Sequence, residues 1–158
     1  MEIKKKKKVI LLMIAICMVI IIGLAIYLNK QNRTELYKNS YENAAWGQQN
    51  YGYIIYSDGT IEEFDYFNTD RELKKDKISK EELKNLKELA NLVEDKYEKS
   101  TSMGPMMDAG YHKDEIYSQR LNKWIVLSTS GDSFGSNSTE ESKKILELIK
   151  SIKNKYLK

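Results

Sequence analysis

Residues 51–67, YGYIIYSDGTIEEFDYF, carry the clearest local structural signal in this chain of 158 residues. Two runs rich in β-branched and aromatic residues flank Asp58 and Gly59. This dipeptide is preferred in two-residue hairpin loops, because both central positions of a type I′ turn need positive φ. We therefore predict a β-hairpin with a two-residue loop, in which Tyr53 lies opposite Phe64.

In this register the hairpin carries aromatic residues on both faces, whereas a small antiparallel sheet usually leaves one face to solvent. Packing within the sheet explains those rings that are buried. We expect the uncovered rings to bind a partner, because tyrosine tolerates water and offers a large contact area at low entropic cost. The predicted partner-binding patch consists of Tyr51, Tyr53, Tyr56, Phe64 and Tyr66.

Two downstream segments carry the signals of capped helices. Ser79 and Glu82 have the spacing of a capping box and precede an apolar stripe at helical intervals, which predicts a helix over residues 79–98. Ser138 and Glu141 have the same spacing ahead of a second apolar stripe. We expect a second helix from there to the C-terminal end of the sequence.

Residues 114–129, between the two helices, have strand character on both sides of a predicted turn at 120–123. The order hairpin, helix, hairpin, helix predicts an α+β domain of the ββαββα type. Its antiparallel sheet would have about four strands, with two helices on one face. The two halves have similar plans, but the Asp-Gly turn has no counterpart in the second half, so we do not infer a repeat.

The N-terminal part of the chain has a different character. Residues 9–28, VILLMIAICMVIIIGLAIYL, contain no charge and as a helix would measure about 30 Å, the thickness of a bilayer core. Lysines 4–8 precede them, and positive charge beside a span favours the cytoplasmic side. We predict a cytoplasmic basic tail over 1–8, a transmembrane helix over 9–28 that contacts the lipid bilayer, a juxtamembrane stalk over 29–50, and an extracytoplasmic domain over 51–158.

This organisation describes a single-pass protein of the cell membrane with its C-terminal domain outside. A cleaved signal peptide is the alternative, since Gly23-Leu24-Ala25 loosely fits a cleavage site. Five lysines and one glutamate give residues 1–28 a net charge of +4, against +3 for the whole chain, so the remainder carries −1. A near-neutral domain lacks the basic face typical of nucleic-acid binding. Cys17 is the only cysteine, which excludes an internal disulfide.

One short motif resembles a catalytic block. Gly131-Asp132-Ser133 follows an apolar strand, as does the GDS-L block of SGNH-type esterases, and that resemblance implies Ser133 as a nucleophile. The esterases carry their catalytic histidine near the C-terminal end, whereas His112, the only histidine here, precedes the block. A serine without a base is a poor nucleophile. We therefore predict no catalytic residue, and keep a small serine hydrolase as an alternative function.

Two other clusters of residues suggest a ligand site, but for both we favour a structural explanation. His112 lies near Asp108, Asp114 and Glu115, but this spacing matches no zinc site, so we predict no metal and no cofactor. Methionines 103, 106 and 107 surround the only proline. They would suit an adaptable binding surface, and we expect them instead to close the edge of the core.

The chain as a whole is rich in Lys, Ile, Asn, Glu and Tyr, with one proline and one cysteine. In this amino-acid composition it resembles the small single-pass membrane-anchored proteins of low-GC Gram-positive, clostridial-type bacteria, many of unknown function. The strand and helix order is more faintly similar to the emfourins, small protease inhibitors. We expect a non-enzymatic binding domain whose partner is an envelope protein or cell-wall polymer. A further alternative is an accessory subunit of a larger membrane complex.

Overall fold

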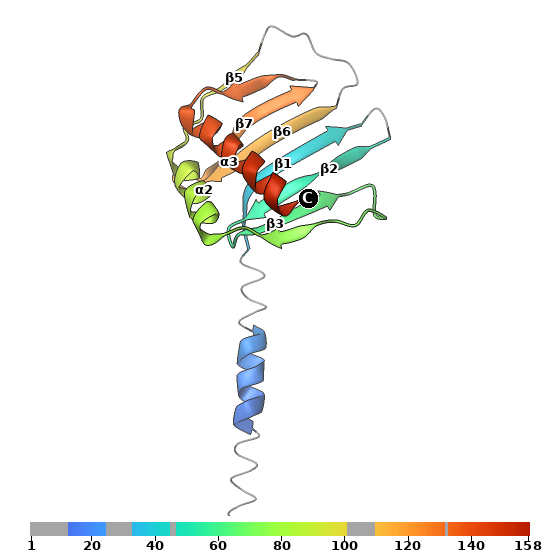
Figure 1. The fold of residues 1–158 in the computed structure, drawn as a ribbon, viewed down its shortest axis with the longest axis vertical. Helices are drawn as coiled ribbons and strands as arrows, with labels where there is room; N and C mark the ends of the chain where they lie inside the picture. Colours follow the sequence, from blue (N-terminus) through green and yellow to red (C-terminus); the bar gives the residue numbers. More distant parts are fainter. Residues whose placement is uncertain (1–12, 25–32, 45–46, 101–109, 132) are drawn as a thin grey trace, which may run out of the picture. The chain divides into compact units, whose positions relative to one another are not determined.

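The computed structural model describes residues 13–24, 33–44, 47–100, 110–131 and 133–158 (Figure 1). The chain divides into two compact units, Met1–Arg33 and Thr34–Lys158. The predicted basic tail over 1–8 and the methionines at 103, 106 and 107 lie outside the described residues.

The first unit corrects the predicted membrane topology. Its described part is a helix over residues 13–24, and no helix among the described residues is long and apolar enough to cross a membrane. This finding contradicts the transmembrane helix over 9–28, the single-pass topology and the localisation at the cell membrane. Residues 9–12 and 25–28 of the predicted span lie outside the described part of the chain.

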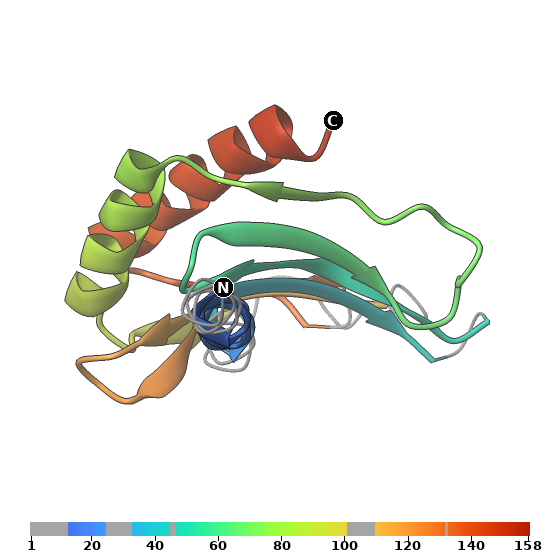
Figure 2. The ribbon, with the colours of Figure 1, turned by 90° about the horizontal axis from the view of Figure 1, so that it is seen from below.

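The second unit is built on one antiparallel sheet of eight strands in the order β4-β3-β2-β1-β6-β7-β8-β5. Figure 2 shows both helices of this unit on the same side of the sheet. The elements are β1 (Glu35–Asn43), β2 (Gln49–Tyr56), β3 (Thr60–Asp65), β4 (Lys75–Lys77), α2 (Lys80–Leu92), β5 (Tyr97–Lys99), β6 (Tyr111–Ser118), β7 (Lys123–Gly131), β8 (Gly135–Asn137) and α3 (Glu140–Tyr156).

The predicted ββαββα domain is wrong in its strand count. The largest difference is β1, which falls within the predicted stalk over 29–50 and yet lies at the centre of the sheet, between β2 and β6. Its residues are mostly polar, so they gave no apolar alternation to recognise. Tyr37 of this strand is fully buried. The strands β4, β5 and β8 have three residues each, too few to show any period.

The hairpin of β2 and β3 forms, but in a register one residue away from the predicted one. The Gly59 N–H donates to the Tyr56 carbonyl at 2.9 Å, and Ile55 lies opposite Ile61. Gly59 has φ +86°, whereas Asp58 is not among the non-glycine residues with positive φ. The loop is therefore a turn followed by a left-handed glycine rather than type I′, and this added residue moves the β3 side chains to opposite faces.

Both helices begin with side-chain caps. The predicted capping box at α2 is confirmed: the Glu82 N–H donates to Ser79 Oγ at 3.2 Å and the Ser79 N–H to Glu82 Oε2 at 2.9 Å. This helix ends at Leu92 rather than residue 98. At α3 the cap is Thr139, one residue after the predicted Ser138, and its hydroxyl accepts from Ser142 N–H at 3.2 Å.

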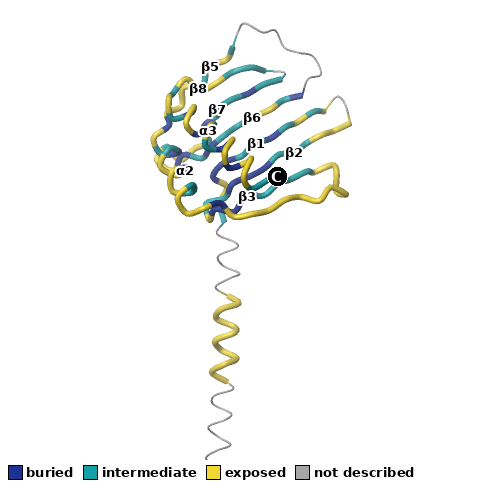
Figure 3. Tube along the Cα trace, viewed as in Figure 1, coloured by how far each residue is buried: buried dark blue, intermediate teal, exposed yellow. Residues whose placement is uncertain are grey.

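The core lies between the sheet and the two helices. The apolar stripes of α2 and α3 are buried against one face of the central strands, where Figure 3 shows the buried residues gathering. This burial removes large aliphatic and aromatic side chains from water, the main favourable contribution to folding. The fully buried apolar side chains are Tyr37, Ile55, Ile61, Leu86, Val93, Ile116, Ile125, Leu127, Ile145 and Ile152.

Candidate ligand-binding pocket

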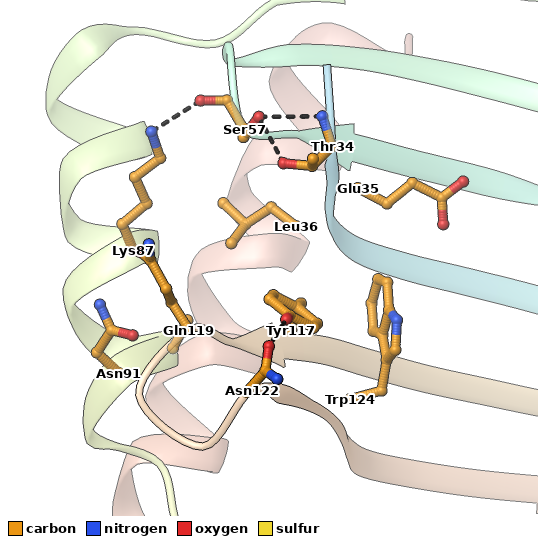
Figure 4. A pocket seen from close by; sticks show the side chains of 11 residues that line it. Thr34, Glu35, Leu36, Ser57, Lys87, Asn91, Tyr117, Gln119, Asn122 and Trp124 are labelled. Atoms are coloured by element: carbon orange, nitrogen blue, oxygen red, sulfur yellow. Dashed lines mark hydrogen bonds between the residues drawn. The ribbon is translucent and has the colours of Figure 1, made fainter. Parts of the chain in front are cut away.

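A pocket of about 740 Å³ lies where the ends of the strands meet α2 (Figure 4). We call it the strand-end pocket. It draws residues from the start of β1, the turn after β2, one side of α2, and the β6–β7 hairpin. The lining residues are Thr34, Glu35, Leu36, Ser57, Lys87, Ala90, Asn91, Tyr117, Gln119, Asn122 and Trp124.

One wall is a hydrogen-bonded joint between three elements. The Ser57 N–H donates to the Thr34 carbonyl at 2.8 Å, and the Thr34 N–H and hydroxyl donate to Ser57 Oγ at 3.2 and 2.9 Å. The Lys87 ammonium of α2 donates to the Ser57 carbonyl at 2.7 Å. These bonds fix the first residues of β1 and the hairpin turn beside the helix, so this wall is held in place before any ligand arrives.

A second joint holds the opposite wall. The Arg120 side chain donates from Nε to the Asn91 carbonyl at 2.6 Å and from Nη2 to the Val93 carbonyl at 3.3 Å. The last turn of α2 contains no basic residue of its own, and its terminal carbonyls need donors. Arg120 supplies them from the β6–β7 turn, and thereby attaches this turn to the helix.

The turn between β6 and β7 presents the aromatic part of the pocket. Asn122 has φ +51°, a left-handed conformation that asparagine tolerates better than most residues. Its Oδ1 accepts from the Tyr117 hydroxyl at 2.5 Å. The Tyr117 and Trp124 rings meet edge to face with centroids 5.8 Å apart. In Figure 4 Tyr117 and Leu36 lie between α2 and β1, with Trp124 on the strand side.

The charges of the strand-end pocket balance. Lys87 contributes one positive charge and Glu35 one negative charge, and the other polar side-chain groups of the lining are amides, hydroxyls and the Trp124 indole N–H. Glu35 and Gln119 are exposed, and neither has a side-chain hydrogen bond among the described residues. A second hollow of about 290 Å³ follows α2 and shares Lys87 and Asn91 with the pocket. The site therefore suits a neutral ligand with both polar and apolar surfaces.

The residues of the predicted partner-binding patch do not gather on one face. Tyr53 is 6% exposed and lies under the helices, with Lys153 Nζ of α3 5.4 Å from its ring centroid. Tyr51 shares that side of β2. Tyr56 and Phe64 point to the other face of the sheet, because alternate residues of a strand face opposite ways. Tyr66 follows β3 and is 61% exposed.

Some rings of that patch do pair with neighbours. Phe64 and Tyr66 have ring centroids 5.1 Å apart, and Lys38 Nζ lies 5.6 Å from the Phe64 ring. On the helix side, Tyr51 packs against Tyr41 at 5.0 Å. The patch is therefore two smaller aromatic groups, one on each side of β2 and β3.

The fold gives no geometric support to the alternative function, a serine hydrolase with Ser133 as nucleophile. Among the described residues, Ser133 and His112 share no hydrogen bond, and the His112 ring instead packs on Tyr41 with centroids 4.5 Å apart. Asp132 and Asp108 lie outside the described residues. No group of three metal-binding side chains occurs in the part of the chain that the structure describes.

Asp114 has a structural role on the helix side of the sheet. Its carboxylate accepts hydrogen bonds from the Tyr37 hydroxyl, from Asn39 Nδ2 at 2.9 Å and from Ser128 Oγ at 2.7 Å. Burial raises the pKa of Tyr37 well above its ordinary value, and Tyr53 and Asp114 add to this. Burial also raises the pKa of Tyr53 to about 12. Both tyrosines stay neutral and serve the core.

Sequence reasoning did not find the strand-end pocket, because its parts come from segments far apart in the chain. The start of β1 lay in the predicted stalk, and Trp124 was interpreted only as a strand residue. The one local signal was the turn beside Trp124, which positions Asn122. In comparisons with known proteins, the chain matches no family model and no curated protein.

Proposed function

We propose that the chain is a non-enzymatic binding domain whose ligand occupies the strand-end pocket. The observation that carries the proposal is the combination of an aromatic pair with side-chain amides in a hollow of about 740 Å³. Small-molecule sites have volumes of roughly 300–1,000 Å³, and they pair apolar walls with a few placed polar groups. The Ser57 and Arg120 joints hold such groups in position.

The groups that line the strand-end pocket favour binding over catalysis. Its described lining residues include no histidine to activate a hydroxyl, and Ser57 Oγ already accepts two hydrogen bonds from Thr34. A serine nucleophile needs a base within hydrogen-bond reach. The sole histidine, His112, lies on β6 with its ring against Tyr41 and is not among the residues that line the pocket. We therefore prefer a binding domain over the serine hydrolase that Ser133 suggests, and place its partner, an envelope protein or cell-wall polymer, at this pocket.

Nuclear magnetic resonance on the full-length chain tests this proposal. A library of small neutral fragments is titrated, and shifts of the Trp124 indole N–H and of the Asn91 and Asn122 side-chain amides are followed. We expect the fragment hits to cluster at these three groups. Hits that cluster on another surface would show that the pocket is not the binding site.

A parallel assay tests the absence of catalysis. The full-length chain and Ser133→Ala are compared for hydrolysis of p-nitrophenyl acetate, a reactive ester that reports even weak nucleophilic serines. We expect equal rates, no faster than background. A rate in the parent chain that disappears in Ser133→Ala would support the hydrolase and contradict the proposed function.

A further inference from the structure

The strand-end pocket continues along α2 into the second hollow of about 290 Å³. The two hollows share Lys87 and Asn91, which lie about one turn apart on the helix (Figure 4). All six residues that line the second hollow belong to α2, and they extend from Lys80 to Asn91. This length of helix rises by about 16 Å. The two hollows therefore form one elongated site, and we call its part along α2 the helix groove.

Positive charge lines the helix groove. Lys80, Lys84 and Lys87 recur at intervals of four and three residues, which places them on one face of α2. All three side chains are exposed. The one acidic residue of the lining, Glu88, lies 3.8 Å from Lys84 in an exposed ion pair, a kind of contact that contributes little. Three lysines and one glutamate give the helix groove a net charge of +2, which favours an acidic ligand.

The ammonium groups of the helix groove keep donors for such a ligand. Lys87 Nζ donates to the Ser57 carbonyl at 2.7 Å, and an ammonium group has three donors. Lys80 forms no ion pair with any other described residue. A ligand carboxylate beside these lysines would accept charge-assisted hydrogen bonds, which are roughly twice as strong as those between neutral groups.

The strand-end pocket, at the other end of the site, has a different chemistry. Its charges balance, and its lining includes the aliphatic Leu36 and the rings of Tyr117 and Trp124. Apolar walls of this kind suit an apolar side chain. The elongated site thus changes along its length from basic to apolar, so a ligand that fills it needs acidic groups at one end and an apolar group at the other.

We propose that the elongated site binds an extended acidic segment of a partner protein, with its acidic residues along the helix groove and an apolar side chain in the strand-end pocket. Lys80 and Lys87 are about 10 Å apart along the helix axis, and three residues of an extended peptide cover the same distance. A neutral polysaccharide lacks the charges that three lysines recognise. This inference rests on the proposed binding function and adds the class of partner.

Tryptophan fluorescence gives a direct test, because the chain has only two tryptophans. In the full-length Trp46→Phe variant, Trp124 is the single reporter. The blocked peptide Glu-Asp-Glu-Gly-Leu-Leu should shift its emission saturably. Gln-Asn-Gln-Gly-Leu-Leu lacks the charges and Glu-Asp-Glu-Gly-Ser-Ser lacks the apolar side chains, so we expect each to bind at least about tenfold more weakly. Each sequence is also measured in reverse order, because either chain direction fits the site.

Two pairs of substitutions locate the contact. Lys80→Gln with Lys84→Gln removes two charges from the helix groove, and we expect it to weaken binding of the acidic peptide about three- to tenfold. Lys144→Gln with Lys150→Gln on α3 is the matched control, because it removes the same charge from residues that line neither hollow. It should change the affinity less than about twofold. All four lysines are exposed, so the melting temperature should change little in either variant.

Each other outcome overturns the inference in a distinct way. Equal binding of the glutamine peptide, or equal weakening by the two lysine pairs, would show that the helix groove does not recognise acidic residues. Equal binding of the serine peptide would show that no apolar side chain enters the strand-end pocket. If no peptide acts on Trp124 but tri-N-acetylchitotriose does, or the fragment hits still cluster at the pocket, the inference fails and the proposed function stands. If peptides, sugar and fragments all leave the pocket unaffected, the proposed function fails together with the inference.

Discussion

The Tyr156 hydroxyl, near the end of α3, donates a 2.7 Å hydrogen bond to Glu82 Oε2 in the first turn of α2. The Ser79 N–H donates both to the same carboxylate and to the tyrosine oxygen. Lys155 Nζ reaches Glu82 Oε1 at 3.1 Å. The capping box of one helix is thus also the contact that attaches the C-terminal turn of the other, although the two sites are 74 residues apart.

Replacing Tyr156 by phenylalanine removes only the hydroxyl. We expect the free energy of unfolding to fall by about 1.5 kcal/mol, which is at the lower end of the range for a hydrogen bond to a charged group. Urea denaturation of the full-length chain measures it. Tyr66→Phe is the matched control, since this ring is 61% exposed, and its effect should stay within about 0.5 kcal/mol. Equal effects of the two substitutions would mean that the Tyr156 bond adds nothing.

Glu82 also makes the stability of the folded chain depend on pH in the acid range. Burial acts to raise its pKa, but hydrogen bonds from Ser79, Tyr156 and Lys155 outweigh burial and lower the pKa from 4.5 to about 2. The unfolded chain therefore binds this proton at higher pH than the folded chain does. The stabilisation is complete above about pH 4.5 and is lost as the pH falls toward about 2. Stability of Glu82→Gln, followed by urea midpoints across this window, should depend less steeply on pH. A slope unchanged from the parent chain would contradict this account.

The start of α2 could be predicted from sequence, and the start of α3 to within one residue, because a cap is a local device. Ser79 and Glu82 are three residues apart, and their reciprocal hydrogen bonds need nothing from the rest of the chain. Most of the added strands could not be predicted, because they depend on distant partners. Tyr97–Lys99 lay within the predicted helix, but it forms a strand that pairs with β8. The central strand β1 is ordered by ladders to β2 and β6 rather than by its own pattern.

Gly59 decides the register of the first hairpin. A valine there would adopt φ +86° at a cost of about 1–2 kcal/mol or more, and its Cβ would lie 3.3 Å from Leu83 Cδ2. Gly47 has φ +87° with nothing within 4 Å of a Cβ, so Gly47→Val isolates the backbone cost. We expect Gly59→Val to lose more stability than Gly47→Val in urea denaturation. Equal losses would show that crowding by α2 has no effect.

The candidate site was less predictable than the fold. Trp124 and Asn122 are neighbours in sequence, but Glu35 and Asn91 join them only when the sheet and α2 assemble. The one-residue register shift at Gly59 places Phe64 on the face of the sheet opposite Tyr53, although the sequence predicted the two rings on one face. A pattern of residue types shows which side chains are available, whereas the pairing of strands decides which of them meet.

The buried tyrosines under the helices make the stability of the folded chain depend on pH in the alkaline range. Burial raises the pKa of Tyr53 to about 12, so the folded chain keeps a proton that the unfolded chain releases near its ordinary value of 10. Its contribution to stability is therefore complete below about pH 10 and is lost as the pH rises toward about 12. Tyr53→Phe should reduce the fall in urea midpoint over this range, and Tyr66→Phe should not. An identical fall in Tyr53→Phe and the parent chain would exclude this origin.

The position of β1 gives the sharpest test of the fold. A fragment that begins at residue 45 lacks this strand and with it the buried Tyr37, so β2 and β6 lose the strand that joins them. Unpaired strand edges and an open core should leave it without a cooperative unfolding transition. A fragment of residues 34–158 keeps the whole second unit and should unfold cooperatively. Far-ultraviolet circular dichroism during thermal unfolding distinguishes the two. Cooperative unfolding of the shorter fragment would mean that the residues expected to form a stalk are dispensable, and that β1 does not hold the sheet together.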